Sequence, residues 1–230
     1  MQSILSENQK NILQLLGNEK SIADHFYFGG GTALAEFYLQ HRLSEDLDFF
    51  SEHEFEPQDI SIVLKKIKKS AGIVNVEYIQ SFNRSLFFLK LKQDASYQKT
   101  AQQEMVKTEF TYFPFPRIEK KMKTDELYVD SLLDIAVNKI FTIYQKPRSR
   151  DFIDLYCILQ KEKSWTLDDL VKKAQIKFDN HLDPIQLGTQ YLKAQELKDY
   201  PKMIITIDER VWQNFFLTAA KKLKDSIILT

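Results

Sequence analysis

A run of three glycines constrains this chain more than any other feature. Residues 29–31 hold three of its 6 glycines, so tight backbone geometry is concentrated at one point in 230 residues. A helical pattern follows, and then the acidic run SEDLDFF, which contains Asp46 and Asp48. The apolar residues before the glycines and the aromatic end of the acidic run predict strand, turn, helix and strand within residues 28–50.

The two aspartates of this unit predict a metal site. Asp46 and Asp48 are two residues apart, so a strand places both side chains on one face. Adjacent carboxylates repel each other unless a cation or a raised pKa relieves them. Oxygen ligands favour a hard cation, and Mg²⁺ is usually held by one or two carboxylates together with substrate phosphates. The alternative is an aspartate in a turn followed by an exposed one.

The glycine turn predicts the phosphate side of the same site. Glycines directly before Thr32 would present backbone N–H groups at a helix N-terminus, where phosphate binds readily. Glycines often occur only because a turn needs their backbone freedom, so the glycine turn indicates phosphate binding only in combination with the carboxylates. Together the two features predict a metal–nucleotide site.

A third carboxylate is expected on a later strand. In residues 106–113 the alternation of side chains places Lys107, Glu109 and Thr111 on one face. Glu109 is therefore the candidate third ligand or base. The alternative is a surface ion pair between Lys107 and Glu109.

The rest of the chain predicts an α/β (α+β) protein. Residues 73–92 have the pattern of a β-hairpin with its turn at 82–84, and residues 104–113 that of a third strand. From about residue 130 helical patterns dominate. We expect helices at 6–16, 32–41, 57–67, 131–145, 151–161, 167–178, 185–194 and 208–223. The predicted organisation is a core of residues 1–127 with a mixed sheet, and a helical subdomain of residues 128–230 that packs on it.

The composition excludes few functions, but it indicates the cellular compartment in which the protein is expected. Lys plus Arg and Asp plus Glu number 32 each, so no global charge favours a nucleic acid partner. The single cysteine, Cys157, excludes an internal disulfide, and we expect it to be a small core residue. The sequence has no apolar run long enough for a membrane span and no secretion signal, so we expect a cytoplasmic protein.

Several motifs together resemble one family. They are GGTAL, then HR-x-S-x-DLDFF, then VKTEF, and then a helical Lys…Arg-Asp…Asp-Leu segment within residues 133–155. This pattern, covering most of residues 26–160, is similar to the nucleotidyltransferase superfamily and in particular to the AbiEii/AbiGii toxin group. The resemblance implies a nucleotidyltransferase-like core with a C-terminal helical subdomain.

The resemblance also implies roles for individual residues. The expected metal ligands for Mg²⁺ or Mn²⁺ are Asp46, Asp48 and Glu109, and the expected catalytic residues are these three and Lys139. Lys139 would stabilise the leaving pyrophosphate, and its alternative is a lysine at the margin of the core. The expected nucleotide-binding residues are Gly30, Gly31, Thr32, Arg42, Ser44, Lys107, Arg150 and Asp151. A helical ion pair between Arg150 and Asp154 is also open, because the two are four residues apart.

The function implied is transfer of a nucleoside monophosphate from an NTP to an acceptor hydroxyl, with release of pyrophosphate. The acceptor would be RNA, such as tRNA, or a protein, and a cognate antitoxin is an expected partner. The alternative is a non-catalytic nucleotide-binding module that acts through a protein partner. A P-loop kinase is disfavoured, because the sequence lacks the pattern GxxxxGK[ST].

Overall fold

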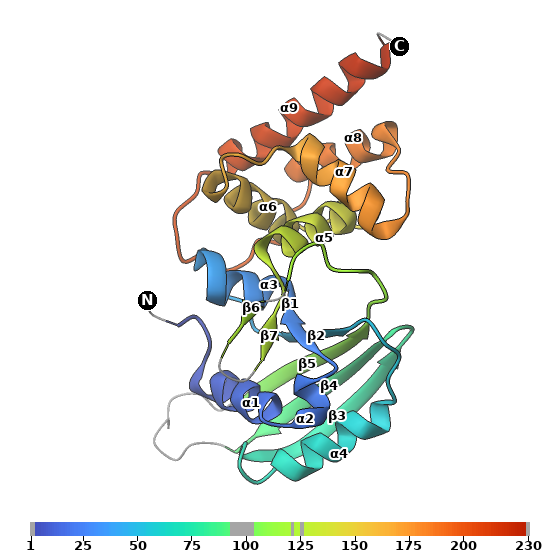
Figure 1. Ribbon diagram of the computed structural model, residues 1–230. Helices are drawn as coiled ribbons and strands as arrows, with labels where there is room; N and C mark the ends of the chain where they lie inside the picture. The colour runs from blue at the N-terminus through green and yellow to red at the C-terminus, as the bar shows by residue number, and fades with distance from the viewer. Residues whose placement is uncertain (1–2, 93–103, 121, 125–126, 229–230) are drawn as a thin grey trace. The chain divides into compact units, whose positions relative to one another are not determined.

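The computed structural model describes residues 3–92, 104–120, 122–124 and 127–228 (Figure 1). The chain forms two compact units, each assembled from separate segments. The first, which we call the sheet unit, consists of Met1–Glu36, Ser44–Pro116 and Lys120–Asp130. The second, the helical unit, consists of Phe37–Leu43, Arg117–Glu119 and Ser131–Thr230.

The sheet unit is built on one mixed sheet of described strands. Their order is β3-β4-β5-β2-β1-β7-β6. β2 runs antiparallel to β1 and parallel to β5, and β4 runs antiparallel to both β3 and β5. The bounds are β1 Tyr27–Gly29, β2 Leu47–Ser51, β3 Ile73–Ser81, β4 Arg84–Leu91, β5 Met105–Tyr112, β6 Met122–Lys123 and β7 Tyr128–Val129.

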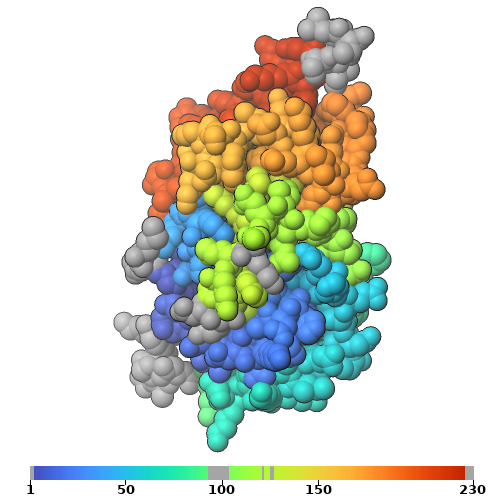
Figure 2. Space-filling model, in the orientation of Figure 1, coloured from blue at the N-terminus to red at the C-terminus, as the bar shows by residue number. Residues whose placement is uncertain are grey.

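Helices accompany the sheet because each has an apolar face to bury. α1 (Glu7–Gly17) begins at Ser6, whose side chain and that of Gln9 form a reciprocal capping box. α4 (Pro57–Ile67) begins with a proline, which needs no hydrogen-bond partner in the first turn, and buries residues at helical spacing. α2 spans Lys20–Ala23. α1 contacts α4, and blue N-terminal residues lie next to cyan residues on the visible surface (Figure 2).

The core of the sheet unit is rich in phenylalanine. Alternate side chains of β2 and β5 are buried, and the rings of Phe49 and Phe110 stack at 4.8 Å between centroids. Phe26 and Phe87 pack edge-on against Phe110. Since this aromatic face is buried, the period of two places Asp48 of β2 together with Lys107 and Glu109 of β5 on the other face.

The helical unit consists of five longer helices and a short 3₁₀ turn in its described part. They are α5 Leu132–Gln145, α6 Ser149–Lys161, α7 Leu167–Phe178, α8 Pro184–Leu192, η2 Lys193–Gln195 and α9 Glu209–Ile228. Phe152 of α6 packs on Trp212 and Phe216 of α9, which forms part of the core. No helix among the described residues is long and apolar enough to cross a membrane.

Most of the predicted elements are confirmed within a few residues. The predicted helix at 32–41 is shorter and irregular, because α3 (Gly30–Ala33) continues into a π-helix, η1 (Leu34–Leu39), and Gln40 has a φ of 51°. α2, β6 and β7 were not predicted, since two to four residues carry no usable periodicity. The boundary between residues 127 and 128 stays a prediction, and residues 125–126 beside it lie outside the described part.

Candidate functional site

The glycine turn and the first carboxylates lie next to each other in the sheet unit. Gly29 ends β1 opposite Asp48 of β2, and Gly30 turns the chain into α3 with a φ of 69°. A Cβ atom on Gly30 would lie 2.4 Å from Asp48 Oδ2. The Asp48 carboxylate therefore lies against the turn itself, where only a residue without a side chain fits.

Thr32 connects the start of the helix to the strand that carries the carboxylates. Its side chain is fully buried, and its hydroxyl donates to the backbone oxygen of Asp46 and lies 2.7 Å from the Ser44 hydroxyl. Thr32 and Ser44 therefore hold the turn and the start of β2 together. Their predicted contacts with nucleotide are not tested by the structure and stay predictions.

Glu109 belongs to the same cluster. β2 and β5 are parallel neighbours, and their register places Asp48 opposite Glu109. The predicted alternation in β5 is confirmed: Lys107 and Glu109 are half-buried, with Val106, Thr108 and Phe110 buried between and beside them. The sheet thus brings Glu109 of β5 beside Asp48 of β2, and Asp46 lies directly before β2, although the two strands are far apart in the sequence.

Two basic side chains are inserted among these carboxylates. Lys107 Nζ is 3.1 Å from Asp46 Oδ2 and 3.2 Å from Glu109 Oε2. Arg84 Nη1, from the start of β4, is 3.2 Å from Glu109 Oε1. Burial by itself lowers the pKa of Lys107, but the charges and hydrogen bonds of Asp46 and Glu109 raise it above its ordinary value. Lys107 is therefore a charged ammonium at neutral pH.

The chemistry of this cluster fits a divalent cation, but its carboxylates are not arranged as a finished metal site. Asp46, Asp48 and Glu109 offer only oxygen ligands, as Mg²⁺ prefers, and an ammonium already bridges two of them. Within the described ranges, however, no group of three or more His, Cys, Asp or Glu side chains could hold a metal ion. Lys107 Nζ and Arg84 Nη1 contact oxygens of Asp46 and Glu109 instead.

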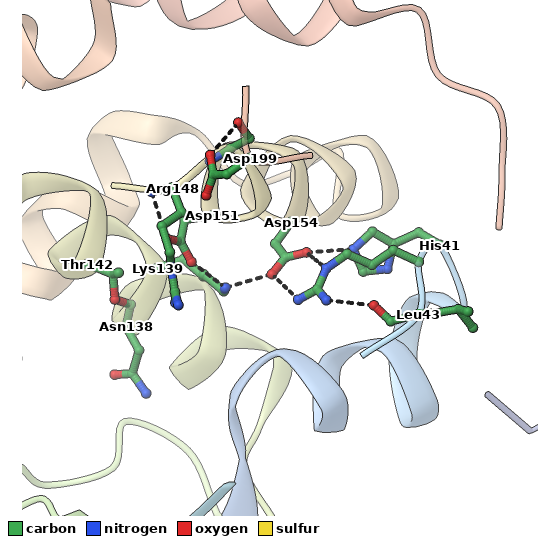
Figure 3. Close-up of polar contacts among 11 residues, drawn as sticks. His41, Leu43, Asn138, Lys139, Thr142, Arg148, Asp151, Asp154 and Asp199 are labelled. Atoms are coloured by element: carbon green, nitrogen blue, oxygen red, sulfur yellow. Dashed lines mark hydrogen bonds and ion pairs between the residues drawn. The ribbon is translucent and has the colours of Figure 1, made fainter. Parts of the chain in front are cut away.

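Arg42, Lys139 and Asp151, which were also predicted, belong to the helical unit and take part in a buried ionic network there (Figure 3). Asp154 of α6 lies at its centre, and it is fully buried. Arg42 donates to both of its oxygens, through Nε at 2.6 Å and Nη2 at 2.9 Å, and His41 Nε2 is 2.7 Å from Oδ1. Arg42 is 1% exposed. Its predicted contact with phosphate stays a prediction, but here its guanidinium binds a carboxylate.

Lys139 of α5 completes the network. Its Nζ lies 2.7 Å from Asp151 Oδ1 and 2.6 Å from Asp154 Oδ2, and the residue is 8% exposed. The other oxygen of Asp151 accepts from the backbone N–H of Arg148, at the start of α6. Lys139 is thus buried, not at the margin of the core, and its ammonium is paired with two carboxylates. Its role toward pyrophosphate stays a prediction.

The ion pair considered between Arg150 and Asp154 does not form within the described structure. Asp154 binds Arg42, His41 and Lys139 instead, and Arg150 is half-buried with no ion pair among the described residues. Helical spacing allows such a pair, but the tertiary contact with Arg42 offers bidentate geometry, which is stronger. The predicted binding of nucleotide by Arg150 and Asp151 is not tested.

Burial and basic neighbours act in opposite directions on the acidic groups of this network. Burial alone would raise the pKa of Asp154, but Lys139 and Arg42 hold it well below its ordinary value. The pKa of Asp151 is lowered in the same way, by Lys139 and Arg148 against burial. Cys157, predicted to be a core residue, is buried, and burial raises the pKa of its thiol to about 12.

Some residues that build these clusters were not singled out from the sequence. Arg84 lies at the predicted hairpin turn, and nothing local connects it with Glu109. Asp134 and Lys177 form a buried ion pair at 2.7 Å in the helical unit. A local signal existed only for Asp134, because Ser131 three residues earlier has the spacing of a helix cap, and the structure confirms that Ser131 caps α5.

The mixed sheet, with a glycine turn beside a carboxylate pair, defines the class of protein as nucleotidyltransferase-like. Solved structures share this fold. A putative nucleotidyltransferase from Helicobacter pylori matches with a TM-score of 0.60 and 20% identity, over 96% of this chain and 97% of that one. MenT4, a nucleotidyltransferase toxin from Mycobacterium tuberculosis, matches with a TM-score of 0.60 and 16% identity, over 94% of this chain and 82% of that one.

Sequence comparison identifies the family. The model of the family described as "Nucleotidyl transferase AbiEii toxin, Type IV TA system" matches residues 14–225. An uncharacterized protein of Aquifex aeolicus, aq_aa25, is 30% identical over 161 residues, which cover 69% of each chain. The chain belongs to the AbiEii nucleotidyltransferase toxin family of type IV toxin–antitoxin systems.

Proposed function

We propose that this toxin transfers a nucleoside monophosphate from an NTP to an acceptor hydroxyl of RNA, such as tRNA, or of a protein. The acceptor oxygen attacks the α-phosphorus, the bond from that phosphorus to the bridging oxygen breaks, and pyrophosphate leaves with the electron pair. The acceptor proton passes to a base. The family assignment supports an NTP substrate and an antitoxin, and we propose that both meet the toxin in the cytoplasm.

One observation carries this proposal: the Asp48 carboxylate lies against the left-handed Gly30 turn, with Asp46 two residues before it and Glu109 opposite it. A carboxylate pair beside an amide-lined helix start is suited to a triphosphate with its divalent cation. Asp46, Asp48 and Glu109 would hold Mg²⁺ or Mn²⁺, which would supply positive charge against the negative charge that develops on the leaving group. Gly30, Gly31 and Thr32 would orient the β- and γ-phosphates.

Glu109, the candidate proton acceptor, is already engaged by basic side chains. Both oxygens of Glu109 accept from basic side chains, Arg84 on one and Lys107 on the other. A carboxylate engaged in this way is a poor base until one partner leaves. The same observation favours the second candidate, a nucleotide-binding module that transfers nothing and acts through a protein partner.

Labelled nucleotides distinguish the candidates. The purified chain is incubated with Mg²⁺ and with each NTP, labelled on either the α- or the γ-phosphate, together with total RNA or cell lysate. Nucleotidyl transfer predicts that the α-label is retained on RNA or on protein and that the γ-label is released in pyrophosphate. Retention of the γ-label would refute it, and binding without any labelled product would support the binding module.

Substitution of the carboxylates provides the second test. Asp46→Asn and Asp48→Asn, made separately, should each abolish incorporation of the α-label and relieve growth inhibition in cells. Glu77→Gln, in an exposed ion pair with Lys90 on β3 and β4, is a matched control that should do neither. Toxicity that survives both aspartate substitutions would exclude the enzymatic mechanism.

A further inference from the structure

Lys107 occupies the place of a cation in the candidate site. Its ammonium lies 3.1 Å from Asp46 Oδ2 and 3.2 Å from Glu109 Oε2, so one positive charge bridges two carboxylates on neighbouring strands. β5 fixes this position, because Lys107 and Glu109 are two residues apart and their side chains share a face. The side chain of Lys107 is 26% exposed, and that of Glu109 is 12% exposed. Water therefore screens this contact less than it would on an open surface.

The charges of the cluster explain why the bridge is stable. Asp46, Asp48 and Glu109 contribute three negative charges, while Lys107 and Arg84 contribute two positive ones. The cluster therefore retains one net negative charge with no metal bound. Without Lys107 it would hold three carboxylates against a single guanidinium, and their mutual repulsion would grow.

We propose that Lys107 is the internal counter-ion of this site and that a divalent cation must displace it in order to bind. This inference rests on the proposed metal-dependent function. A divalent cation held by these carboxylates would compete with the ammonium, which already contacts one oxygen of Asp46 and one of Glu109. Lys107 thus stabilises the metal-free site and weakens its affinity for metal. It is a positioning residue, and its ammonium becomes available to other anions once the metal is bound.

Metal binding by itself tests the proposal, without any measurement of turnover. Mn²⁺ is titrated into the full-length protein, and free Mn²⁺ is followed by its electron paramagnetic resonance signal. Because Lys107→Met removes the competing charge, we expect it to bind Mn²⁺ about tenfold more tightly than the unmodified protein. Lys107→Arg keeps the charge and should show no such gain.

Thermal unfolding supplies an independent readout. In EDTA, Lys107→Met should unfold at a lower temperature than the unmodified protein, because three carboxylates then repel one another. Saturating Mn²⁺ should remove most of that difference. Lys90→Met is the matched control, since Lys90 bridges to Glu77 across β4 and β3 in the same sheet but away from the cluster, and it should change neither the affinity nor its metal dependence.

The outcomes separate this inference from the proposed function. If the unmodified protein binds Mn²⁺, Asp48→Asn abolishes binding, and Lys107→Met binds with unchanged or weaker affinity, then Lys107 is not a competing counter-ion and the proposal is overturned. If the unmodified protein and Asp48→Asn bind Mn²⁺ equally, the metal site itself is wrong and the proposed function fails with it. If Lys107→Met does not fold, a gain in affinity for Lys107→Arg would equally overturn the proposal.

Discussion

At the scale of single residues, Gly30 determines both the backbone turn and the position of the Asp48 carboxylate. Its φ of 69° lies in a region that residues with a Cβ atom rarely adopt. Because glycine has no Cβ, there is also room for the Asp48 carboxylate beside it. The sequence indicated a turn here, because glycines are scarce elsewhere. Only the folded structure shows that the Asp48 carboxylate occupies the space where a Cβ of residue 30 would lie.

We predict that Gly30→Ala lowers nucleotidyl transfer by about a hundredfold, because the new Cβ displaces Asp48 from its position. Backbone strain should also lower the free energy of unfolding by about 1–2 kcal/mol. Gly72→Ala is a matched control: Gly72 has a φ of 66°, but a Cβ there would meet nothing within 4 Å. Gly72→Ala should lower the free energy of unfolding but leave nucleotidyl transfer unchanged. Equal losses of activity in both variants would show that strain, not the carboxylate, is responsible.

At the scale of elements, α6 organises the helical unit. Its buried face presents Asp151 and Asp154 one turn apart, and these bind the side chain of Lys139 and the segment that carries His41 and Arg42. Each group is buried but has ionic partners. Such a cluster contributes little net stability while it is complete, and it destabilises strongly when one member is removed.

Asp154→Asn tests this property of α6. The substitution leaves Arg42 and Lys139 buried without their shared negative charge, so we expect a loss of about 3–5 kcal/mol in the free energy of unfolding. Chemical denaturation followed by circular dichroism measures it. Asp208→Asn, which affects an exposed ion pair with Arg210, is the control and should leave the midpoint unchanged. A loss no larger than that of the control would contradict the role of α6.

The pH dependence of stability follows from the same helices. Asp134, Asp151 and Asp154 have pKa values below their ordinary value, because basic neighbours outweigh burial. A lowered folded-state pKa stabilises the protein above the unfolded value of about 3.9, and this stability is lost as the pH falls further toward the folded values. Urea midpoints of the full chain should therefore fall steeply below about pH 4. Asp134→Asn should show a shallower decline; an unchanged slope would exclude Asp134 as a contributor.

At the scale of the whole molecule, neither compact unit is a continuous stretch of chain. Residues 37–43 and 117–119 belong to the helical unit, although the residues on both sides of each segment belong to the sheet unit. Arg42 and His41 lie in the first of these segments and are almost fully buried. A division of the chain at one position therefore removes part of the helical core.

We accordingly predict that a fragment of residues 131–230 does not fold cooperatively. It lacks His41 and Arg42, and Asp154 would keep Lys139 as its single basic partner among the described residues. Thermal unfolding followed by circular dichroism, together with the dispersion of amide signals in a two-dimensional NMR spectrum, compares the fragment with the full chain. A sharp transition and well-dispersed signals from the fragment would show that the helical unit is independent.

The sequence by itself determined the local elements and the acidic face of the sheet unit. A strand alternates with a period of two, so Asp46 with Asp48, and Lys107 with Glu109, were each paired by spacing alone. Glycine scarcity located the turn, and helical periodicity located the larger helices. These predictions succeeded because each depends on residues within a few positions of one another.

Only the tertiary structure decided which charges bind each other. Arg42 and Asp154 are 112 residues apart, and Lys107 and Asp46 are 61 apart, so no periodicity connects them. Arg42 could equally have faced phosphate, and Glu109 could have been an open ligand. Backbone geometry repeats over a few residues, whereas the partner of a charged side chain depends on which distant segments pack beside it.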